Sequence, residues 1–598
     1  MRTVPLTCKV VEPTGSTPSE LSPLRKTIMK DINPITKLDY PDPDVIRVGD
    51  TYYMVSTTMY FMPGCEILRS YDLVNWEHAS YVYDTLDGTA AQRLEGKENI
   101  YGCGMWAASL RFHKGVYYVC FVANDTHKTY IYQSKDINGP WDKYTLEDFY
   151  HDNSILFDDD GRIYIIYGNK DIYIKELTYE EQGRDGACTH LTDAGAAPAK
   201  LILSDSDNVY LGYEGSHFYK INGKYYIFAI HMPKSTARRT EAVFVADKPE
   251  GPYYGKDVMD DDRGYRGSGV AQGGIVDTPS ENWYSILFQD SGSVGRIPIL
   301  MPVTWQKISV ADLSVTTASS NDDPISTDED GKVNFPVFGE DGIIPEEFET
   351  EDLKPGYEYT PLVSGDDFKA DYAGAQSSSF GFKPCWQFNH EPDLSLVNRD
   401  YENGTVAIKT DKISSNLVQA GNVLTQRTLF PGCRACVTVD ASGINDGDYA
   451  GLCLLESQYG FIAVTKRNSS YYLVMGKREL DTKDFWGERH DDEPFEEMEC
   501  ILLESPIVTL HAGVCFDYDA YKKTGRDSAA DSQPGIIPSD DDTVSFFYNM
   551  SSGHLKKIGI DHKLVFKLDH FTGARFGLFI YSTRKTGGSA VFSDFIYR

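Results

Sequence analysis

The feature that most constrains the fold is a short pattern that occurs five times in the first half of this 598-residue chain. Each copy is a turn followed by an aromatic, apolar strand, and the copies read VGDTYYMV, HKGVYYVC, DDGRIYII, INGKYYIF and SENWYSIL. The aligned aromatic residues, 46 to 65 residues apart, are Tyr53, Tyr118, Tyr164, Tyr226 and Tyr284. Five copies at the spacing of a β-propeller blade predict a five-bladed β-propeller.

A second regularity accompanies this repeat. The residues twelve positions before four of the tyrosines, and eleven before Tyr53, are Asp42, Trp106, Asp152, Glu214 and Gln272. Because equivalent positions of successive blades surround the propeller axis, we expect these five side chains to face one place. The three acids have unusual flanks, in YPDPDV, YHDNSIL and GYEGSHF, which are more typical of burial or catalysis than of a solvated surface. The alternatives are chance and, for Asp42 and Asp152, the capping of a turn.

The rest of the chain predicts a second β-rich domain. Segments such as GTVAIKT, SSYYLVMGK and ARFGLFIYS alternate as half-buried strands do, which indicates a β-sandwich. We therefore predict an all-β protein with a polar leader (1–30), a propeller (31–345), a linker (346–361) and a C-terminal sandwich (362–598).

The charge balance restricts the partners. With 57 basic and 89 acidic residues the net charge is −32, which disfavours nucleic acid and anionic membranes and leaves neutral ligands such as a small oligosaccharide. A homo-oligomer stays open. The N-terminal sequence lacks the apolar core of a secretion signal, so we expect a cytoplasmic protein, unless a signal has been removed.

The cysteines predict neither a disulfide framework nor a metal site. Their number is eleven, which is odd, and their spacing is irregular, so a reduced interior is expected. The single CxxC, Cys433 to Cys436, has no second ligand pair nearby for zinc. We interpret it as an apolar strand with two buried thiols.

Three acids around one axis match the needs of glycosidic bond hydrolysis. That reaction needs a proton donor for the leaving oxygen, and either a nucleophilic carboxylate or a base that activates water. The donor must be protonated near neutral pH, which requires burial or a neighbouring negative charge to raise its pKa. One acid can be the base, one the donor, and the third can tune the donor.

The same residues carry a family resemblance. NPITKLDYPDPDVIRVGDTYYMVSTT, GMWAASLRF, YHDNSILFDDDG, GYEGSHFYK and QGGIVDTPSENWYSILFQDSGSVGR resemble the ordered motifs of glycoside hydrolase family 43. The second region is similar to the concanavalin-like β-sandwich of the family's β-xylosidase-like members, on KPCWQFNHEPD, LTQRT and DGDYAGL. The resemblance implies an inverting exo-glycosidase that releases a terminal pentose, β-D-xylose and/or α-L-arabinofuranose, from xylo- or arabinoxylo-oligosaccharides. It implies no required cofactor or metal, and leaves a structural calcium ion open.

The motifs also imply roles for single residues. Asp42 is similar to the general base, Glu214 to the general acid, and Asp152 to the acid that tunes and orients the donor. Arg296 of VGR and Trp106 of GMWAA match residues that contact the sugar. For each of these residues a purely structural role is the alternative.

Two further residues complete the predicted substrate-binding set. Gln272 stands where many members have a histidine, which puts an axial metal in doubt. Phe61, in TTMYFMPG, is expected to give the sugar an apolar wall, with ordinary core packing as the alternative. We also expect the sandwich to lend a loop to the rim of the pocket, near the adjacent aromatic residues Phe485 and Trp486.

Two rival functions remain. Retaining fructan hydrolases share the architecture but open on a WMNDPNG-like motif, where this chain has YPDPD. A sugar-binding propeller without catalysis is the second rival, and the presence of all three acids argues against it.

Overall fold

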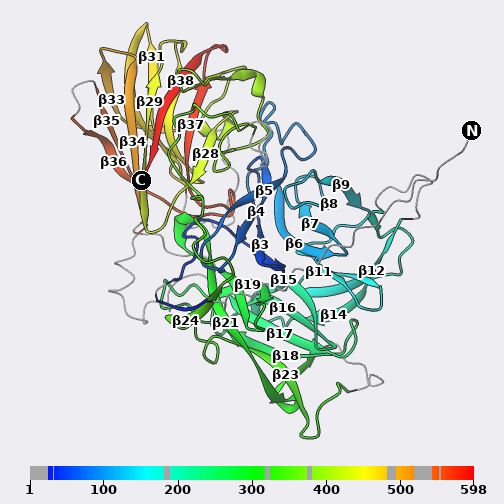
Figure 1. Cartoon of the computed structure of the whole chain (residues 1–598). Coiled ribbons are helices and arrows are strands. Elements are labelled where there is room, and N and C mark those ends of the chain that lie inside the picture. Colours follow the sequence, from blue (N-terminus) through cyan, green and yellow to red (C-terminus); the bar gives the residue numbers. More distant parts are fainter. Residues whose placement is uncertain are drawn as a thin grey trace, which may run out of the picture.

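The computed structural model describes residues 25–30, 32–180, 189–316, 324–372, 380–480, 493–516, 542–550 and 554–598. Within these ranges the chain is built of strands in two bodies, a propeller and a sandwich (Figure 1), which confirms the predicted fold class. The described helices are short 3₁₀ turns, namely Gly292–Val294, Val310–Asp312, Leu394–Leu396 and Leu417–Gln419. None of the helices in the described ranges has the length and apolarity needed to cross a bilayer.

Within the described ranges, five antiparallel sheets of four or five strands form the propeller, and all but one of the strands follow chain order. The first two blades are β2 (Asp44–Val48), β3 (Thr51–Ser56), β4 (Gly64–Ser70) and β5 (Glu77–Tyr83), then β6 (Met105–His113), β7 (Val116–Ala123), β8 (Lys128–Ser134) and β9 (Asp142–Leu146). The third is β10 (Ser154–Phe157), β11 (Ile163–Asn169), β12 (Asp171–Tyr179), β13 (Leu191–Thr192) and β14 (Lys200–Ser204). The fourth is β15 (Val209–Ile221), β16 (Lys224–Pro233), β17 (Thr240–Ala246), β18 (Tyr253–Met259) and β22 (Ser314–Thr316). The fifth is β19 (Val270–Asp277), β20 (Trp283–Asp290), β21 (Arg296–Ser309) and β23 (Lys332–Phe338).

The repeated tyrosines lie in the second strand of every blade: β3, β7, β11, β16 and β20. The turn that precedes each of them is the hairpin from the first strand, so the pattern marks one blade each time. The first strands of the blades stand side by side around the axis, and β19 packs against β2 to close the ring. This closure brings residues from five distant segments to one axis.

A two-stranded ribbon joins the end of the predicted leader to the start of the predicted linker. β1 (Arg25–Lys30) pairs antiparallel with β24 (Glu347–Asp352). The chain therefore enters and leaves the propeller at the same place.

In the part of the sandwich that the structure describes, two seven-stranded antiparallel sheets are present. In sheet order the first contains β25 (Gln387–Phe388), β28 (Leu424–Arg427), β37 (Arg575–Ser582), β30 (Asp448–Leu455), β31 (Gly460–Arg467), β32 (Ser470–Lys477) and β33 (Glu496–Leu503). The second contains β26 (Val397–Asp400), β27 (Thr405–Lys409), β38 (Ser589–Tyr597), β29 (Gly432–Asp440), β34 (Ile507–Cys515), β35 (Thr543–Asn549) and β36 (Lys556–Lys563). The alternating side chains of both sheets meet in one apolar core.

The CxxC motif lies on β29, as a strand was predicted, but only one thiol is buried. Cys433 is 5% exposed and belongs to the core, whereas Cys436 is only partly buried. Residues three apart on a strand point to opposite faces, so two buried thiols were a wrong expectation. All cysteines in the described part of the chain are free thiols.

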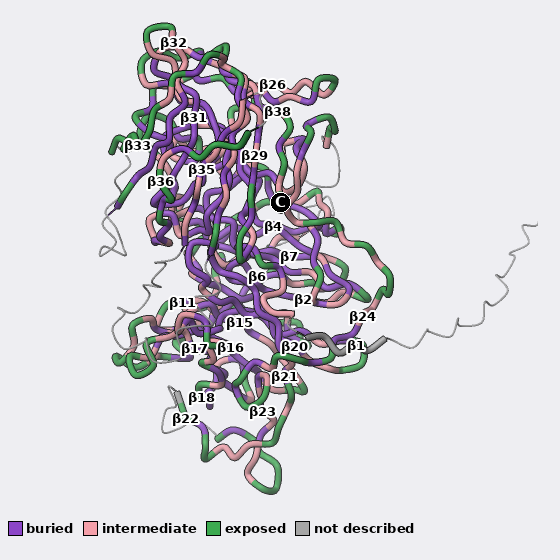
Figure 2. The backbone as a smooth tube through the Cα atoms, turned by 90° about the vertical axis from the view of Figure 1, so that its left-hand side faces the viewer, coloured by how far each residue is buried: buried purple, intermediate pink, exposed green. Residues whose placement is uncertain are grey.

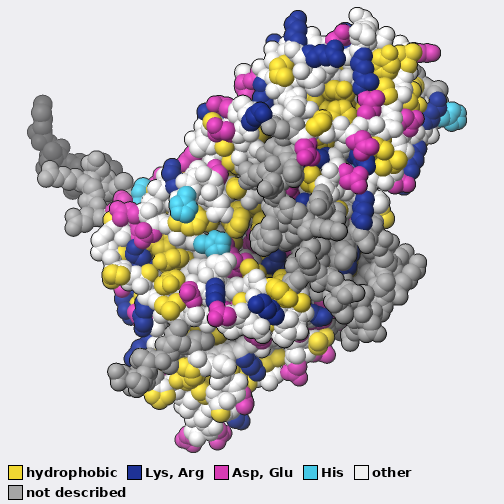
Figure 3. Space-filling model, turned by 180° about the vertical axis from the view of Figure 1, so that it is seen from behind, with side chains coloured by type: hydrophobic (Ala, Val, Ile, Leu, Met, Phe, Trp, Pro, Cys, Tyr) yellow, Lys and Arg dark blue, Asp and Glu magenta, His cyan; other side chains and the backbone are white. Residues whose placement is uncertain are grey.

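The two bodies share a buried boundary, and Figure 2 shows buried segments in the interior of both and between them. Arg427 of the sandwich donates to the Glu66 carboxylate of the propeller at 2.7 Å, and both side chains are buried. Charges of both signs and apolar side chains are interspersed on the face shown in Figure 3. The sandwich is thus packed against the propeller through specific buried contacts.

Candidate active site

A cavity of about 440 Å³ lies where the first strands of the blades begin, within the size range of ligand pockets. Its wall includes all five positions found by counting back from the tyrosines, together with Arg296. Asp42 and Asp152 come two residues before β2 and β10, while Trp106, Glu214 and Gln272 lie in β6, β15 and β19. The structure thus brings together the three acids and three of the four predicted substrate-binding residues.

Asp42 is held from two sides. Arg296 donates from Nη1 to its Oδ1 at 2.7 Å, and the Thr57 hydroxyl donates to its Oδ2 at 2.8 Å. Burial raises the pKa of Asp42, and the Arg296 guanidinium opposes that rise. Nε and Nη2 of Arg296 are buried and have no hydrogen-bond partner within the described residues, so they are available to sugar hydroxyls.

The side chain of His151 lies near the carboxylates of both Asp152 and Glu214. His151 Nε2 lies 3.7 Å from an oxygen of each carboxylate, and the Gly215 N–H donates to Asp152 Oδ2 at 3.1 Å. Burial raises the pKa of Asp152; His151 lowers it and Glu214 raises it further. The Asp152 charge in turn raises the pKa of His151 to about 9. His151 is therefore a cation at neutral pH.

Glu214 is the most accessible of the three acids. Its side chain is 17% exposed, against 8% for Asp42 and 7% for Asp152. The Asn169 amide donates to Glu214 Oε2. An acid that reaches into the cavity while its neighbours are buried is suited to meet a leaving-group oxygen.

These groups could also be considered as a metal site. The ligand atoms of His151, Asp152 and Glu214 lie within 4.8 Å of one another. A metal needs the neutral imidazole, whereas the two carboxylates favour the protonated ring. A metal ion at this set would therefore compete with the proton of His151 for the imidazole.

The sandwich supplies one wall of the pocket. Phe566, Leu568 and Phe571, between β36 and β37, line the cavity. The Arg296 guanidinium lies 4.4 Å from the centre of the Phe571 ring, and Trp106 meets that ring edge-on at 5.8 Å. Sequence reasoning missed this loop, and the residues it named instead, Phe485 and Trp486, lie outside the described part of the chain.

Phe61 does not line the pocket, which corrects the prediction for this residue. It is fully buried, and the Arg575 guanidinium lies 3.4 Å from the centre of its ring. The next residue, Met62, bridges to Phe388 of the sandwich, so this loop packs at the boundary between the two bodies. Within the loop, Met59 is the residue that reaches the cavity.

Several polar residues of the pocket had no sequence signal. Arg239 lies in the wall, and its Nε donates to Asp290 at 2.6 Å. Asn169 and Tyr210 also line the cavity, and Tyr210 is 52% exposed at its mouth. His151 could have been found from its place beside Asp152, whereas the others required the fold.

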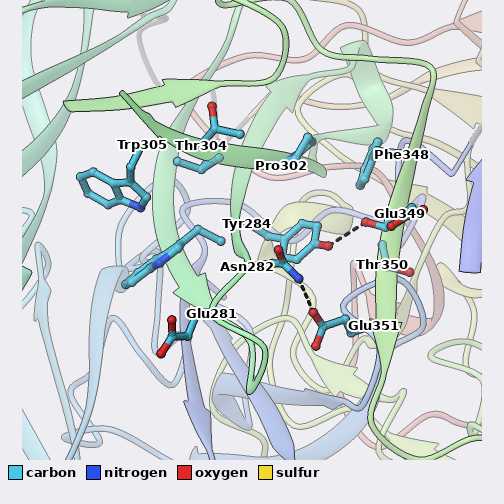
Figure 4. A pocket seen from close by; sticks show the side chains of 12 residues that line it. Glu281, Asn282, Tyr284, Pro302, Thr304, Trp305, Phe348, Glu349, Thr350 and Glu351 are labelled. Atoms are coloured by element: carbon cyan, nitrogen blue, oxygen red, sulfur yellow. Dashed lines mark hydrogen bonds between the residues drawn. The ribbon is translucent and has the colours of Figure 1, made fainter. Parts of the chain in front are cut away.

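A second cavity, of about 390 Å³, lies beside the start of β20 and the middle of β21 (Figure 4). Trp283 and Trp305 form part of its wall, and the Asn282 amide donates to the Glu351 carboxylate. Its lining contains no arginine or histidine to pair with an acid. Of these two cavities in the described part of the chain, the first combines buried acids, a histidine and an arginine, and we take it as the active site.

A five-bladed propeller whose axial pocket is lined by the three ring acids Asp42, Asp152 and Glu214 defines a class, the propeller glycosidases. Residues 32–308 match the family model described as glycosyl hydrolases family 43. Residues 378–498 match the β-xylosidase C-terminal concanavalin A-like domain. The propeller is thus a family 43 domain, and the chain is a glycoside hydrolase of that family.

Relatives of known name agree with this assignment. A β-xylosidase of Formosa agariphila is 25% identical, over 93% of this chain and 88% of its own length. A non-reducing end α-L-arabinofuranosidase of Bacteroides ovatus is 24% identical, over 74% of this chain and 78% of its own length. The structure of a bifunctional GH43-CE protein of Bacteroides eggerthii has a TM-score of 0.76 and 35% identity, over 96% of this chain and 64% of that protein.

Proposed function

We propose that this glycoside hydrolase is an inverting exo-enzyme that removes a terminal β-D-xylose and/or α-L-arabinofuranose from short xylo- or arabinoxylo-oligosaccharides. The observation that carries the exo action is the wall from the sandwich. Phe566, Leu568 and Phe571 close one side of a cavity whose other walls are the propeller blades, so the cavity favours a chain end over an internal unit. The names of the two relatives support a pentose as the released sugar.

We assign Asp42 as the base. It is buried and fixed by Arg296 and Thr57, and as a carboxylate it accepts both hydrogen bonds. It can take a proton from a water that attacks the anomeric carbon. That attack opposite the leaving group inverts the configuration in a single displacement.

We assign Glu214 as the proton donor and Asp152 as a positioning group. The Glu214 carboxyl faces the cavity beside His151, and Asp152 is held by the Gly215 N–H, one residue away from the donor. The proton moves from Glu214 to the glycosidic oxygen as the C–O bond breaks. Afterwards the base releases its proton to solvent and Glu214 takes up another proton from solvent. No cofactor is needed for this sequence.

The test uses leaving groups of different acidity. Glu214→Gln should lower turnover of xylobiose or an arabinoxylan oligomer by about 10³-fold, and that of a nitrophenyl pentoside much less, because a good leaving group needs little protonation. Asp42→Asn should impair both substrates alike. Proton NMR of the first product should show the inverted anomer. Retention, or a wild type inactive on xylosides, arabinofuranosides and arabinoxylan oligomers, contradicts the proposal.

A further inference from the structure

Asp39, three residues before Asp42, is buried at 4% exposure and bonds to both bodies of the protein. Its Oδ1 accepts the backbone N–H of Arg296 at 2.8 Å. Its Oδ2 accepts the backbone N–H of Gly573, in the sandwich loop, at 2.8 Å. One carboxylate therefore ties the strand that carries the active-site arginine to the loop that carries Phe571.

The two segments approach each other backbone to backbone. A Cβ on Gly573 would lie 2.1 Å from the Val294 carbonyl oxygen, and a Cβ on Gly295, at φ 104°, would lie 2.3 Å from Asp39 Oδ1. The next residue, Ala574, donates its N–H to the Ser293 carbonyl at 2.8 Å. Glycine is required at both contacts, because any side chain would push the segments apart.

The hydrogen bonds of Asp39 to Arg296 and Gly573 set the distance between two groups of the pocket. Gly573 follows Phe571 by two residues, and Arg296 is itself the residue held by Asp39 Oδ1. The Phe571 ring and the Arg296 guanidinium are in contact at 4.4 Å. A shift of the loop would move the ring away from the sugar subsite and leave Arg296 without its apolar cover.

We propose that Asp39 is a positioning residue that docks the 564–574 loop of the sandwich onto the Arg296 strand and so completes the substrate pocket. The inference rests on the proposed function, since Arg296 and Phe571 are taken as walls of the sugar subsite. Asp39 touches no reacting atom; it acts through Phe571 and Arg296.

The test is a double-mutant cycle. Asp39→Asn removes an acceptor and places an N–H against an N–H, while Arg427 and Glu66 still hold the two bodies together at 2.7 Å. We expect kcat/KM to fall by about 10- to 100-fold, mainly through KM, as loss of a charge-assisted hydrogen bond suggests. In a Phe571→Ala background the same change should cost no more than about threefold. Gly573→Ala should reproduce the Asp39→Asn effect from the other side of the contact.

Asp366 offers the matched control. Its buried carboxylate also accepts two N–H groups at 2.9 Å, from Phe368 and the Trp386 indole, but both lie within the sandwich. Asp366→Asn should lower the melting temperature and leave kcat/KM of the folded enzyme within about twofold. If Asp39→Asn behaves like this control, or keeps its full effect on kcat/KM without Phe571, the positioning role is refuted.

The docking part of the inference is separable from the proposed function. Thermal unfolding needs no substrate, and Asp39→Asn and Gly573→Ala should be non-additive in the free energy of unfolding. Additive effects there would overturn the docking contact even in an active enzyme. An inactive wild type with non-additive stability effects would instead overturn the substrate assignment alone.

Discussion

Replacing His151 by asparagine tests the charge balance of the site. The imidazolium lies 3.7 Å from oxygens of both Asp152 and Glu214. At that distance a unit charge interacts with a carboxylate by about 4 kcal/mol at an effective dielectric constant of about 20, and by about 1 kcal/mol at that of water. Removal of the cation should therefore raise the apparent pKa values in the pH profile of kcat/KM by about one to three units.

The same substitution has a stability signature whose sign is fixed. The pKa of His151 rises from 6.5 to about 9 on folding, chiefly because of Asp152. The stabilisation by the bound proton is complete below about pH 6.5 and disappears as the pH rises through about 9, and it amounts to at most about 3 kcal/mol. The difference in free energy of unfolding between wild type and His151→Asn should thus shrink across this window.

Replacement of His231 is a control that separates the effect on the pH profile of kcat/KM from the effect on the free energy of unfolding. The pKa of His231 is also raised to about 9, by Asp205 and Asp257 against the effect of burial, and the residue is not part of the pocket lining. His231→Asn should show the pH-dependent loss of stability and leave the pH profile of kcat/KM in place. The reasoning is refuted if His151→Asn leaves the profile within about 0.3 units of wild type, or if His231→Asn moves it equally.

Three further substitutions probe other parts of the structure. Arg296→Lys should lower kcat/KM by about 10- to 100-fold, because the single nitrogen of lysine cannot hold Asp42 and also place donors where Nε and Nη2 of the guanidinium lie; steady-state kinetics will show it. Asp42→Ala should lower kcat by about 10³-fold, and added azide or formate should restore part of it if Asp42 is the base. Phe592→Ala, in the sandwich core, should cost about 3–5 kcal/mol in denaturant unfolding; a cost below about 1 kcal/mol would contradict the packing described.

The blade repeat and the ring were predictable because both are local patterns. The odd spacing of Asp42 also has a structural cause. In the second and fourth blades a β-bulge adds one residue between the ring position and the hairpin, at Met105/Ala108 and Glu214/His217. The first blade has neither a bulge nor a longer turn between β2 and β3, so its ring residue stands one position nearer to the tyrosine.

The sandwich wall could not be predicted in the same way. Phe571 lies more than 250 residues from the propeller residues of the pocket, and no period connects it to them. Its place depends on the contact of Gly573 with Asp39 and Val294, which is a tertiary fact. The prediction for Phe61 was wrong for the complementary reason. An aromatic run near a predicted catalytic motif can pack on a second domain as readily as on a sugar.

The backbone explains why the ring positions present their side chains to the axis. Asp42, Asp152 and Gln272 have φ values of 52°, 47° and 59°, a region that costs a non-glycine residue about 1–2 kcal/mol. In the other two blades the left-handed residue is a glycine near the ring position, Gly104 two residues before Trp106 and Gly215 directly after Glu214. Every blade therefore has a left-handed residue at or near its ring position. In three blades this residue is the ring residue itself, which carries the conformational cost. The surrounding sheets hold these residues in that conformation, which fixes the direction in which each side chain enters the pocket.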